Sequence, residues 1–268
     1  MLYREVAPPP PLDAFVKCLW ILEGPAPPAD APADPILPDG SPEVVFHYGD
    51  PFERVEDGVR VSQHRTAVVG QLSRPMEVRP TGRVGVLGVR FLPDGAAALL
   101  GVPAAETAGR SLALGDLWGA EGRRLEERVG GARDAGARLA AAAAGFAARA
   151  ARAPRPGRTR AAVDLCRRSG GGASVDALAR AAGVSGRHLE RIFRDEVGLA
   201  PKTLARILRF RAALALLRAA APGGPAGVAA DLGYCDQSHL HRDFREFAGA
   251  PPGALLRRPA GVGEPFNS

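Results

Sequence analysis

Hydrophobic residues follow a strand-like pattern in the first third of the chain and a helical pattern over most of the rest. Between residues 43 and 92, short runs of Val, Leu and Phe alternate with Gly, Pro or Asp, as in strands joined by turns. Several short strands at close spacing are typical of a small barrel or sandwich. The four predicted strands are EVVFHYG (43–49), TAVVGQLS (66–73), MEVRPTG (76–82) and VGVLGVRF (84–91).

The segments around these strands carry weaker patterns. Residues 1–42 are Pro-rich and predict irregular structure, with one amphipathic piece, LDAFVKCLWILEG. The segment 93–101, PDGAAALLG, predicts a turn and a short helix. Residues 115–152 are Ala-rich and predict helices, which the two glycines at 130–131 divide. An interrupted apolar stripe supports the helices: Leu117, Leu125, Val129, Leu139 and Phe146.

A linker is expected at residues 153–159, because APRPGRT combines Pro, Gly and Arg without apolar side chains. It separates an N-terminal domain, 1–152, from a C-terminal domain, 160–260. With 268 residues, the chain is long enough for two domains that each bury a core. The predicted fold class is therefore α+β in two domains, a β-rich barrel or sandwich with helices followed by an all-α domain.

After the linker, helices follow one another with clear start and stop signals. Ser174 is a good N-cap, a break falls at Gly183, and Ser185 caps the next helix. A helix, a tight turn with Gly and a second helix form a helix-turn-helix. A long helix then begins at Pro201, where a first-turn proline is favoured.

The end of the chain repeats this plan. Five residues have counterparts 51 positions later, which predicts two copies of one helix-turn-helix unit. Residues 233–255 belong to the second copy. The pairs are Leu189 and Leu240, Arg191 and Arg242, Phe193 and Phe244, Gly198 and Gly249, and Pro201 and Pro252.

Charge is distributed unevenly between the two parts. Residues 155–268 carry 18 Lys and Arg against 10 Asp and Glu, whereas residues 1–154 carry 17 against 19. A basic segment joined to a mildly acidic one is typical of a polyanion-binding module with a separate second domain. Three separated cysteines, no visible secretion signal and no long apolar run favour a cytoplasmic protein.

The Cys and His residues near the C-terminus do not form a metal or catalytic pattern. On a helix, His239 and His241 point away from each other, so they cannot bind one ion together. Cys235 and His239 can meet, but a structural zinc needs four ligands. The spacing indicates no nucleophile and base pair. We therefore predict no metal, no cofactor and no catalytic residue.

Residues 174–258 resemble the DNA-binding region of AraC/XylS-type transcription regulators. The resemblance rests on GYCDQSHLHRDFREFAGAPPGALLR, with its Gly-aromatic, Asp-Gln-Ser-His, Arg-x-Phe and Gly-x-x-Pro elements. It implies two helix-turn-helix units joined by a long helix, about 27 Å long at 1.5 Å per residue. Two recognition helices at that separation can enter successive major grooves of DNA.

The residues expected to contact DNA lie on the faces opposite the buried Leu and Phe positions. Arg fits guanine, Gln suits adenine, and Glu190 can accept from cytosine although it repels phosphate. Phosphate contacts or intramolecular ion pairs are expected for Arg194 and Arg245, and for Arg206 and Arg209 of the long helix. The predicted DNA-binding residues are Arg187, Glu190, Arg191 and Arg194 in the first unit, and Gln237, Ser238, His239, Arg242 and Arg245 in the second.

The N-terminal part is similar to the sensor and dimerisation domain of many AraC-type regulators. Polar side chains in apolar stretches need partners, which makes them candidates for an effector pocket, although ordinary core and rim positions explain them too. A metal-dependent barrel enzyme would need more ligands than His47 and His64. The candidate pocket residues are Trp20, His47, Gln71, Arg90 and Phe91.

The sequence thus predicts a sequence-specific transcription regulator and not an enzyme. Double-stranded DNA is the expected partner; RNA polymerase, a small-molecule effector and a second copy of the chain are further candidates, and a membrane is not. Two alternatives stay open: a DNA-targeted enzyme, and an interaction protein that has lost DNA binding. Cys18, in the apolar FVKCLW, is expected to be buried and inert. The salt dependence of binding separates these cases.

Overall fold

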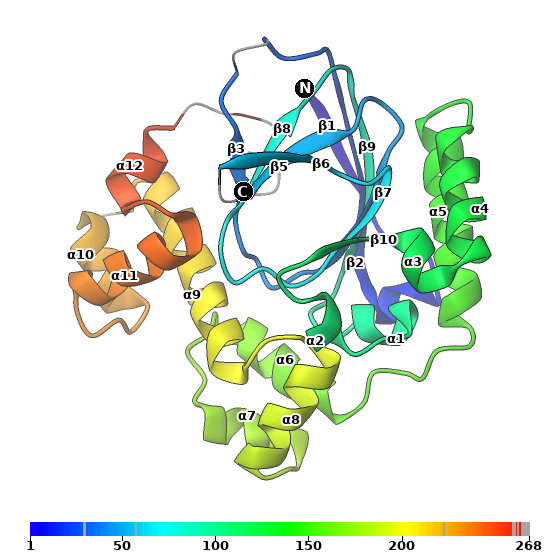
Figure 1. Ribbon diagram of the computed structural model, residues 1–268. Helices are drawn as coiled ribbons and strands as arrows, with labels where there is room; N and C mark the ends of the chain where they lie inside the picture. Colours follow the sequence, from blue (N-terminus) through cyan, green and yellow to red (C-terminus); the bar gives the residue numbers. More distant parts are fainter. Residues whose placement is uncertain (29–30, 57, 222, 259–260, 262, 264–268) are drawn as a thin grey trace.

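Two antiparallel sheets form the N-terminal half of the computed structural model (Figure 1). The structure describes residues 1–28, 31–56, 58–221, 223–258, 261 and 263, so the predicted domain end at 259–260 lies outside the described residues. The larger sheet has the order β1 (Leu2–Val6), β2 (Val16–Gly24), β9 (Val84–Phe91), β4 (Glu43–His47), β7 (Thr66–Val69) and β10 (Ser111–Ala113). The smaller has the order β3 (Asp34–Ile36), β8 (Met76–Pro80), β5 (Phe52–Glu56) and β6 (Val59–Ser62).

The larger sheet is covered on both faces, which explains why its central strands are apolar throughout. Along β2, Leu19 and Ile21 face one core, whereas Trp20 and Leu22 face the other. The first core lies under helices, and the second lies between the two sheets. The predicted fold class is confirmed as a β-rich sandwich with helices, and no closed barrel is present among the described strands.

Helices that follow the strands cover the outer face of the larger sheet. The 3-10 turn η1 (Leu12–Ala14) packs against α5 (Ala135–Ala150). The predicted break at residues 130–131 is confirmed, and Gly119, with φ of 58°, adds another. The helices are α1 (Ala96–Leu100), α2 (Ala104–Thr107), α3 (Leu114–Trp118), α4 (Ala120–Gly130) and α5 (Ala135–Ala150).

The four strands predicted from the sequence are present, as β4, β7, β8 and β9. The prediction that residues 1–42 are irregular is wrong, because they contain β1, β2 and β3. Strand β2 pairs with β9, far along the chain, and both its faces are buried, so it lacks the alternation that marks a half-exposed strand. Strands β5 and β6 also escaped prediction.

The C-terminal half consists of helices, as predicted (Figure 1). Helices α7 and α8 form the first helix-turn-helix, α10 and α11 form the second, and α9 joins them. The bounds are α6 (Arg158–Arg168), α7 (Val175–Ala182), α8 (Gly186–Glu196), α9 (Pro201–Arg218), α10 (Gly224–Asp231), α11 (Gln237–Ala248) and α12 (Pro252–Leu256). No helix in the described part of the chain is both long and apolar enough to span a bilayer.

The duplication predicted from the 51-residue offset is visible in the structure. In each copy the Leu and the Phe are fully buried, and the Pro begins a helix. Gly198 and Gly249 both have left-handed backbone, with φ of 82° and 68°, which explains the repeated glycine. The predicted N-caps are confirmed, because Ser174 Oγ accepts from Ala177 N and Ser185 Oγ from His188 N.

The two halves of the molecule pack against each other. Leu37, from the segment after β3, belongs to the hydrophobic core of the C-terminal helices. Gly40 lies so close to α9 that a Cβ there would be 2.7 Å from Leu204 Cδ1. Arg160 Nε of α6 donates to Asp94 Oδ2 at 2.8 Å. The first helix-turn-helix also touches the N-terminal half, where α8 contacts α1 and α2.

The turn between α6 and α7 gives a sharp test of packing against α9. Gly170 and Gly171 both have left-handed backbone, but only a Cβ at Gly171 meets an obstacle, Ala205 O at 1.9 Å. We expect Gly171→Ala to lower the free energy of unfolding by about 2–3 kcal/mol, and Gly170→Ala by about 1 kcal/mol. Urea denaturation of both variants checks this. Equal losses would contradict a close approach of the turn to α9.

Candidate nucleic-acid interface

Helix α8 presents the predicted contact residues of the first unit to solvent. Leu189 and Phe193 point into the core and are fully buried, which fixes the rotation of the helix. The opposite face is exposed and carries three guanidinium groups and two carboxylates, so it is net positive. Its residues are the four predicted ones, Arg187, Glu190, Arg191 and Arg194, together with Asp195.

A shallow hollow follows the exposed face of α8. It is lined by the four predicted residues together with Ser185 and His188. His188 Nε2 lies 3.1 Å from an Arg191 terminal nitrogen, so the imidazole helps to orient that guanidinium. The sequence interpretation omitted His188. Its position one turn before Arg191 was the available signal, because side chains at i and i+3 share a helix face.

Helix α11 presents the corresponding face of the second unit. Its N-cap is Asp236, whose Oδ1 accepts from His239 N at 2.7 Å. Gln237 Nε2 lies 3.4 Å from His241 Nε2, so this pair forms part of the surface. Four of the five predicted contact residues are exposed: Gln237, Ser238, Arg242 and Arg245.

His239, the fifth predicted residue of this unit, is only half-buried and packs against its own turn. Its ring lies edge-on to Tyr234, with centroids 5.1 Å apart, and Cys235 N lies 3.5 Å from its Nδ1. These contacts leave part of the imidazole exposed while they fix its orientation. A base contact by His239 stays a prediction.

Two arginines of the linking helix, Arg206 and Arg209, make contacts inside the protein. Arg206 donates from Nε and a terminal nitrogen to Asp243 Oδ1, at 3.1 and 2.7 Å, and it also pairs with Glu246. Asp243 is fully buried in α11, so this ion pair fixes the second recognition helix on α9. Arg209 donates to Gly171 O at 3.1 Å and lies over the Tyr234 ring. The predicted intramolecular ion pair is thus present for Arg206, whereas the contacts of Arg209 are a hydrogen bond and a ring contact within the protein.

Cysteine and metal chemistry have little basis in the described residues. Cys18 and Cys166 are buried, and burial raises the pKa of each thiol to about 11. Cys235 is exposed. In the part of the chain that the structure describes, no three His, Cys, Asp or Glu side chains gather as metal ligands would.

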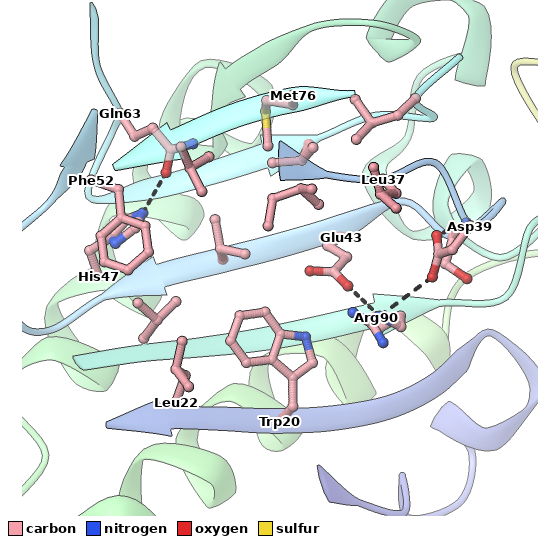
Figure 2. A pocket seen from close by; sticks show the side chains of 17 residues that line it. Trp20, Leu22, Leu37, Asp39, Glu43, His47, Phe52, Gln63, Met76 and Arg90 are labelled. Carbon is pink, nitrogen blue, oxygen red and sulfur yellow. Dashed lines mark hydrogen bonds and ion pairs between the residues drawn. The ribbon is translucent and has the colours of Figure 1, made fainter. Parts of the chain in front are cut away.

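A cavity lies between the two sheets of the N-terminal half (Figure 2). It contains about 680 Å³ of space not filled by atoms, a volume that includes open solvent at its mouth. Three of the five predicted pocket residues line it, namely Trp20, His47 and Arg90. Apolar side chains from both sheets form most of the remaining wall, among them Leu22, Val45, Phe52, Met76 and Val86.

The other two predicted pocket residues lie elsewhere. Phe91 is on the opposite face of the larger sheet, where its ring packs on Phe146 with centroids 5.8 Å apart. Gln71 is buried and donates to Gly40 O at 2.9 Å, so it holds a loop in place. The expectation that all five line one pocket is therefore corrected: alternate residues of a strand face opposite sides of a sheet.

Polar groups occupy the two ends of the cavity. At one end, Arg90 forms an ion pair with Glu43, and its Nε lies 4.0 Å from Asp39 Oδ2. Burial raises the pKa of Glu43, an effect that Arg90 opposes. At the other end, His47 Nε2 lies 2.9 Å from Gln63 Oε1, and burial lowers the pKa of His47 to about 4. The imidazole is therefore neutral at pH 7.

Two known families match separate parts of the chain. A family described as "Helix-turn-helix domain" matches residues 178–258, and a family described as "Domain of unknown function (DUF6597)" matches residues 4–113. Over 82 residues, 31% of this chain, the sequence is 37% identical to the HTH-type transcriptional regulator GlxA of Rhizobium meliloti (strain 1021). The match spans 25% of that relative's length.

The solved structures that match over most of the chain are distant in sequence. ToxT from Vibrio cholerae is 10% identical, with a TM-score of 0.47 over 91% of this chain and 99% of ToxT. A ToxT structure with a bound unsaturated fatty acid gives a TM-score of 0.48 over 91% and 96%, also at 10% identity. The AraC-like transcriptional activator CuxR is 20% identical, with a TM-score of 0.26 over 83% and 87%.

Proposed function

We propose that this chain, whose residues 178–258 match a helix-turn-helix family, is a transcription regulator of the AraC type that binds double-stranded DNA at specific sequences. The observation that carries the proposal is the pair of equivalent helices, α8 and α11, which expose guanidinium groups at matching positions of a duplicated unit: Arg191 with Arg242, and Arg194 with Arg245. Helix α11 also exposes the amide of Gln237. Bidentate Arg contacts suit guanine and Gln suits adenine, so each helix has the groups needed to distinguish base pairs.

The linking helix supports a bipartite DNA site. Helix α9 has 18 residues, which corresponds to about 27 Å at 1.5 Å per residue. Successive major grooves on one face of DNA are about 34 Å apart. We therefore expect two half-elements about one helical turn apart for each protomer, within about 15–20 base pairs.

The N-terminal half is proposed to regulate DNA binding through a small-molecule effector in its cavity. The cavity wall includes Leu37, which also belongs to the core around α9. A ligand that moves Leu37 therefore also changes the packing around α9, the helix that joins the two DNA-binding units. A DNA-targeted enzyme has less support, because the thiols of Cys18 and Cys166 are buried and their pKa values are raised. Action in the cytoplasm, with RNA polymerase as a further partner, completes the proposal.

Salt dependence of DNA binding tests the proposal without knowledge of the target sequence. Phosphate contacts release counterions, so the logarithm of the binding constant falls by about 0.9 for each phosphate neutralised per tenfold increase in salt. Fluorescence anisotropy of a labelled mixed-sequence duplex with the full-length chain measures this slope. We expect a steep negative slope. A protein that binds no duplex at low salt, while circular dichroism shows it folded, would contradict the proposed function.

A further inference from the structure

We propose that the cavity between the sheets binds a small organic cation, an apolar body that carries one ammonium group. This inference deepens the effector part of the proposed function and rests on it. Its basis is the sign of the charges around the cavity, the shape of its wall and the side chains left able to bind a ligand (Figure 2).

Carboxylates outnumber cations at the polar end of the cavity. Of the described side chains that line it, Arg90 alone carries a permanent positive charge, whereas Asp39 and Glu43 are both acidic. Arg90 Nη1 also lies 3.8 Å from Glu5 Oε1, so three carboxylates lie within 4.0 Å of one guanidinium group. Lys17, on the neighbouring strand, is exposed at the surface. An anionic ligand would meet this excess of negative charge, whereas an ammonium group would neutralise part of it.

Asp39 is the carboxylate best placed to receive the ammonium group. Its Oδ1 accepts from Ser41 N at 2.8 Å, which orients the side chain. Its Oδ2 is 4.0 Å from Arg90 Nε, beyond hydrogen-bond distance. Oδ2 can therefore accept a hydrogen bond from a ligand while Oδ1 keeps its bond to Ser41 N.

The wall beside the carboxylates suits an apolar cation. The Trp20 indole points into the cavity in Figure 2. One face of the ring lies on the backbone of Gly88, where a Cβ would be 2.0 Å from Trp20 Cε2. The Tyr3 ring also packs against the indole, with centroids 6.1 Å apart, so Trp20 forms a fixed aromatic part of the wall. Apolar residues from both sheets then enclose the body of the ligand.

The far end of the cavity also disfavours an anion. His47 is 95% buried, and its Nδ1 has no hydrogen-bond partner in the described part of the chain. This buried polar atom can form one neutral hydrogen bond with a ligand. Because the imidazole is uncharged near pH 7, it supplies no positive charge that would attract a carboxylate.

Three probes with one apolar frame test the charge preference directly: 4-phenylbutylamine, 4-phenylbutan-1-ol and 4-phenylbutyrate. Each is titrated into the full-length chain by isothermal calorimetry, without DNA. We expect the amine to bind at least about tenfold more tightly than the alcohol, and the acid to bind most weakly, because the charge of the head group changes from positive to neutral to negative. Equal affinity for amine and alcohol, tighter binding of the acid, or no binding of any probe would overturn the proposal.

Two variants assign the preference to a residue. Asp39→Asn keeps the acceptor for Ser41 N and removes the charge, so it should abolish the preference for the amine while the affinity for the alcohol is unchanged. Asp116→Asn removes an exposed carboxylate of α3, which lies outside the cavity wall, and should change neither. An unchanged amine preference in Asp39→Asn would overturn the role of Asp39.

The same protein preparations separate this inference from the proposed function. Anisotropy with duplex DNA is measured on each of them in parallel with the calorimetry. If the amine shows no preference while DNA binding holds, the organic-cation proposal fails and the regulator stands. If the protein binds the amine but no duplex, the cavity assignment stands and the DNA-binding function fails.

Discussion

The Arg191→Ala/Arg242→Ala protein is expected to bind its specific DNA site with about 2–6 kcal/mol less binding free energy than the wild type, because each arginine contributes about 1–3 kcal/mol as a base contact. The two residues occupy equivalent exposed positions of α8 and α11. Their side chains make no core contacts, so the loss appears in DNA affinity and not in stability.

Each single variant is measured as well, by fluorescence anisotropy on the DNA site that selection of random duplexes yields. Arg124→Ala is the matched control, because Arg124 is exposed on α4 of the N-terminal half and its removal lowers the net charge equally. The control should bind the site as the wild type does. Wild-type affinity in either Arg191→Ala or Arg242→Ala would show that the assigned reading face is wrong.

Arg206→Met is expected to destabilise the folded protein by about 3 kcal/mol, the lower end of the usual loss when one partner of a buried ion pair is removed. Asp243 is fully buried, so without the guanidinium its carboxylate has no compensating charge. Arg206 itself is 27% exposed, which places the effect at the lower end of the range. Urea denaturation gives the free energy of unfolding.

Two further variants identify the cause of this loss. Lys202→Met removes an exposed positive charge from the same helix and should cost less than about 0.5 kcal/mol. Arg206→Met/Asp243→Leu removes both charges and should recover most of the stability, since a buried pair can be replaced by apolar residues at little cost. A double variant as unstable as the single one would contradict the uncompensated-carboxylate account.

The C-terminal half could be predicted from the sequence because its signals are local. Helix caps such as Ser174 and Ser185, and the glycine that ends α7, act within a few residues. The outward faces of α8 and α11 follow from helical geometry once the buried Leu and Phe are known. The pairing of Arg206 with Asp243 could not be predicted, because it joins residues 37 positions apart.

The N-terminal half was harder to predict because its structure depends on distant partners. Strand β2 is buried on both faces only because β9 and the helices cover it. The cavity likewise forms only because the two sheets face each other. Trp20, His47 and Arg90 could be selected as polar or aromatic residues in apolar stretches, but Asp39 and Glu43 could not, since they lie at a turn and at a strand end.

Selection of random duplex DNA on the full-length protein, at near-physiological salt, tests the central claim most directly. The account predicts enrichment of a two-block motif, with the blocks about one helical turn apart and bound by α8 and α11 in successive grooves. The same selection on Arg191→Ala/Arg242→Ala protein should lose both blocks. Enrichment of no sequence by folded wild-type protein, or of the same motif by the double variant, would contradict the account.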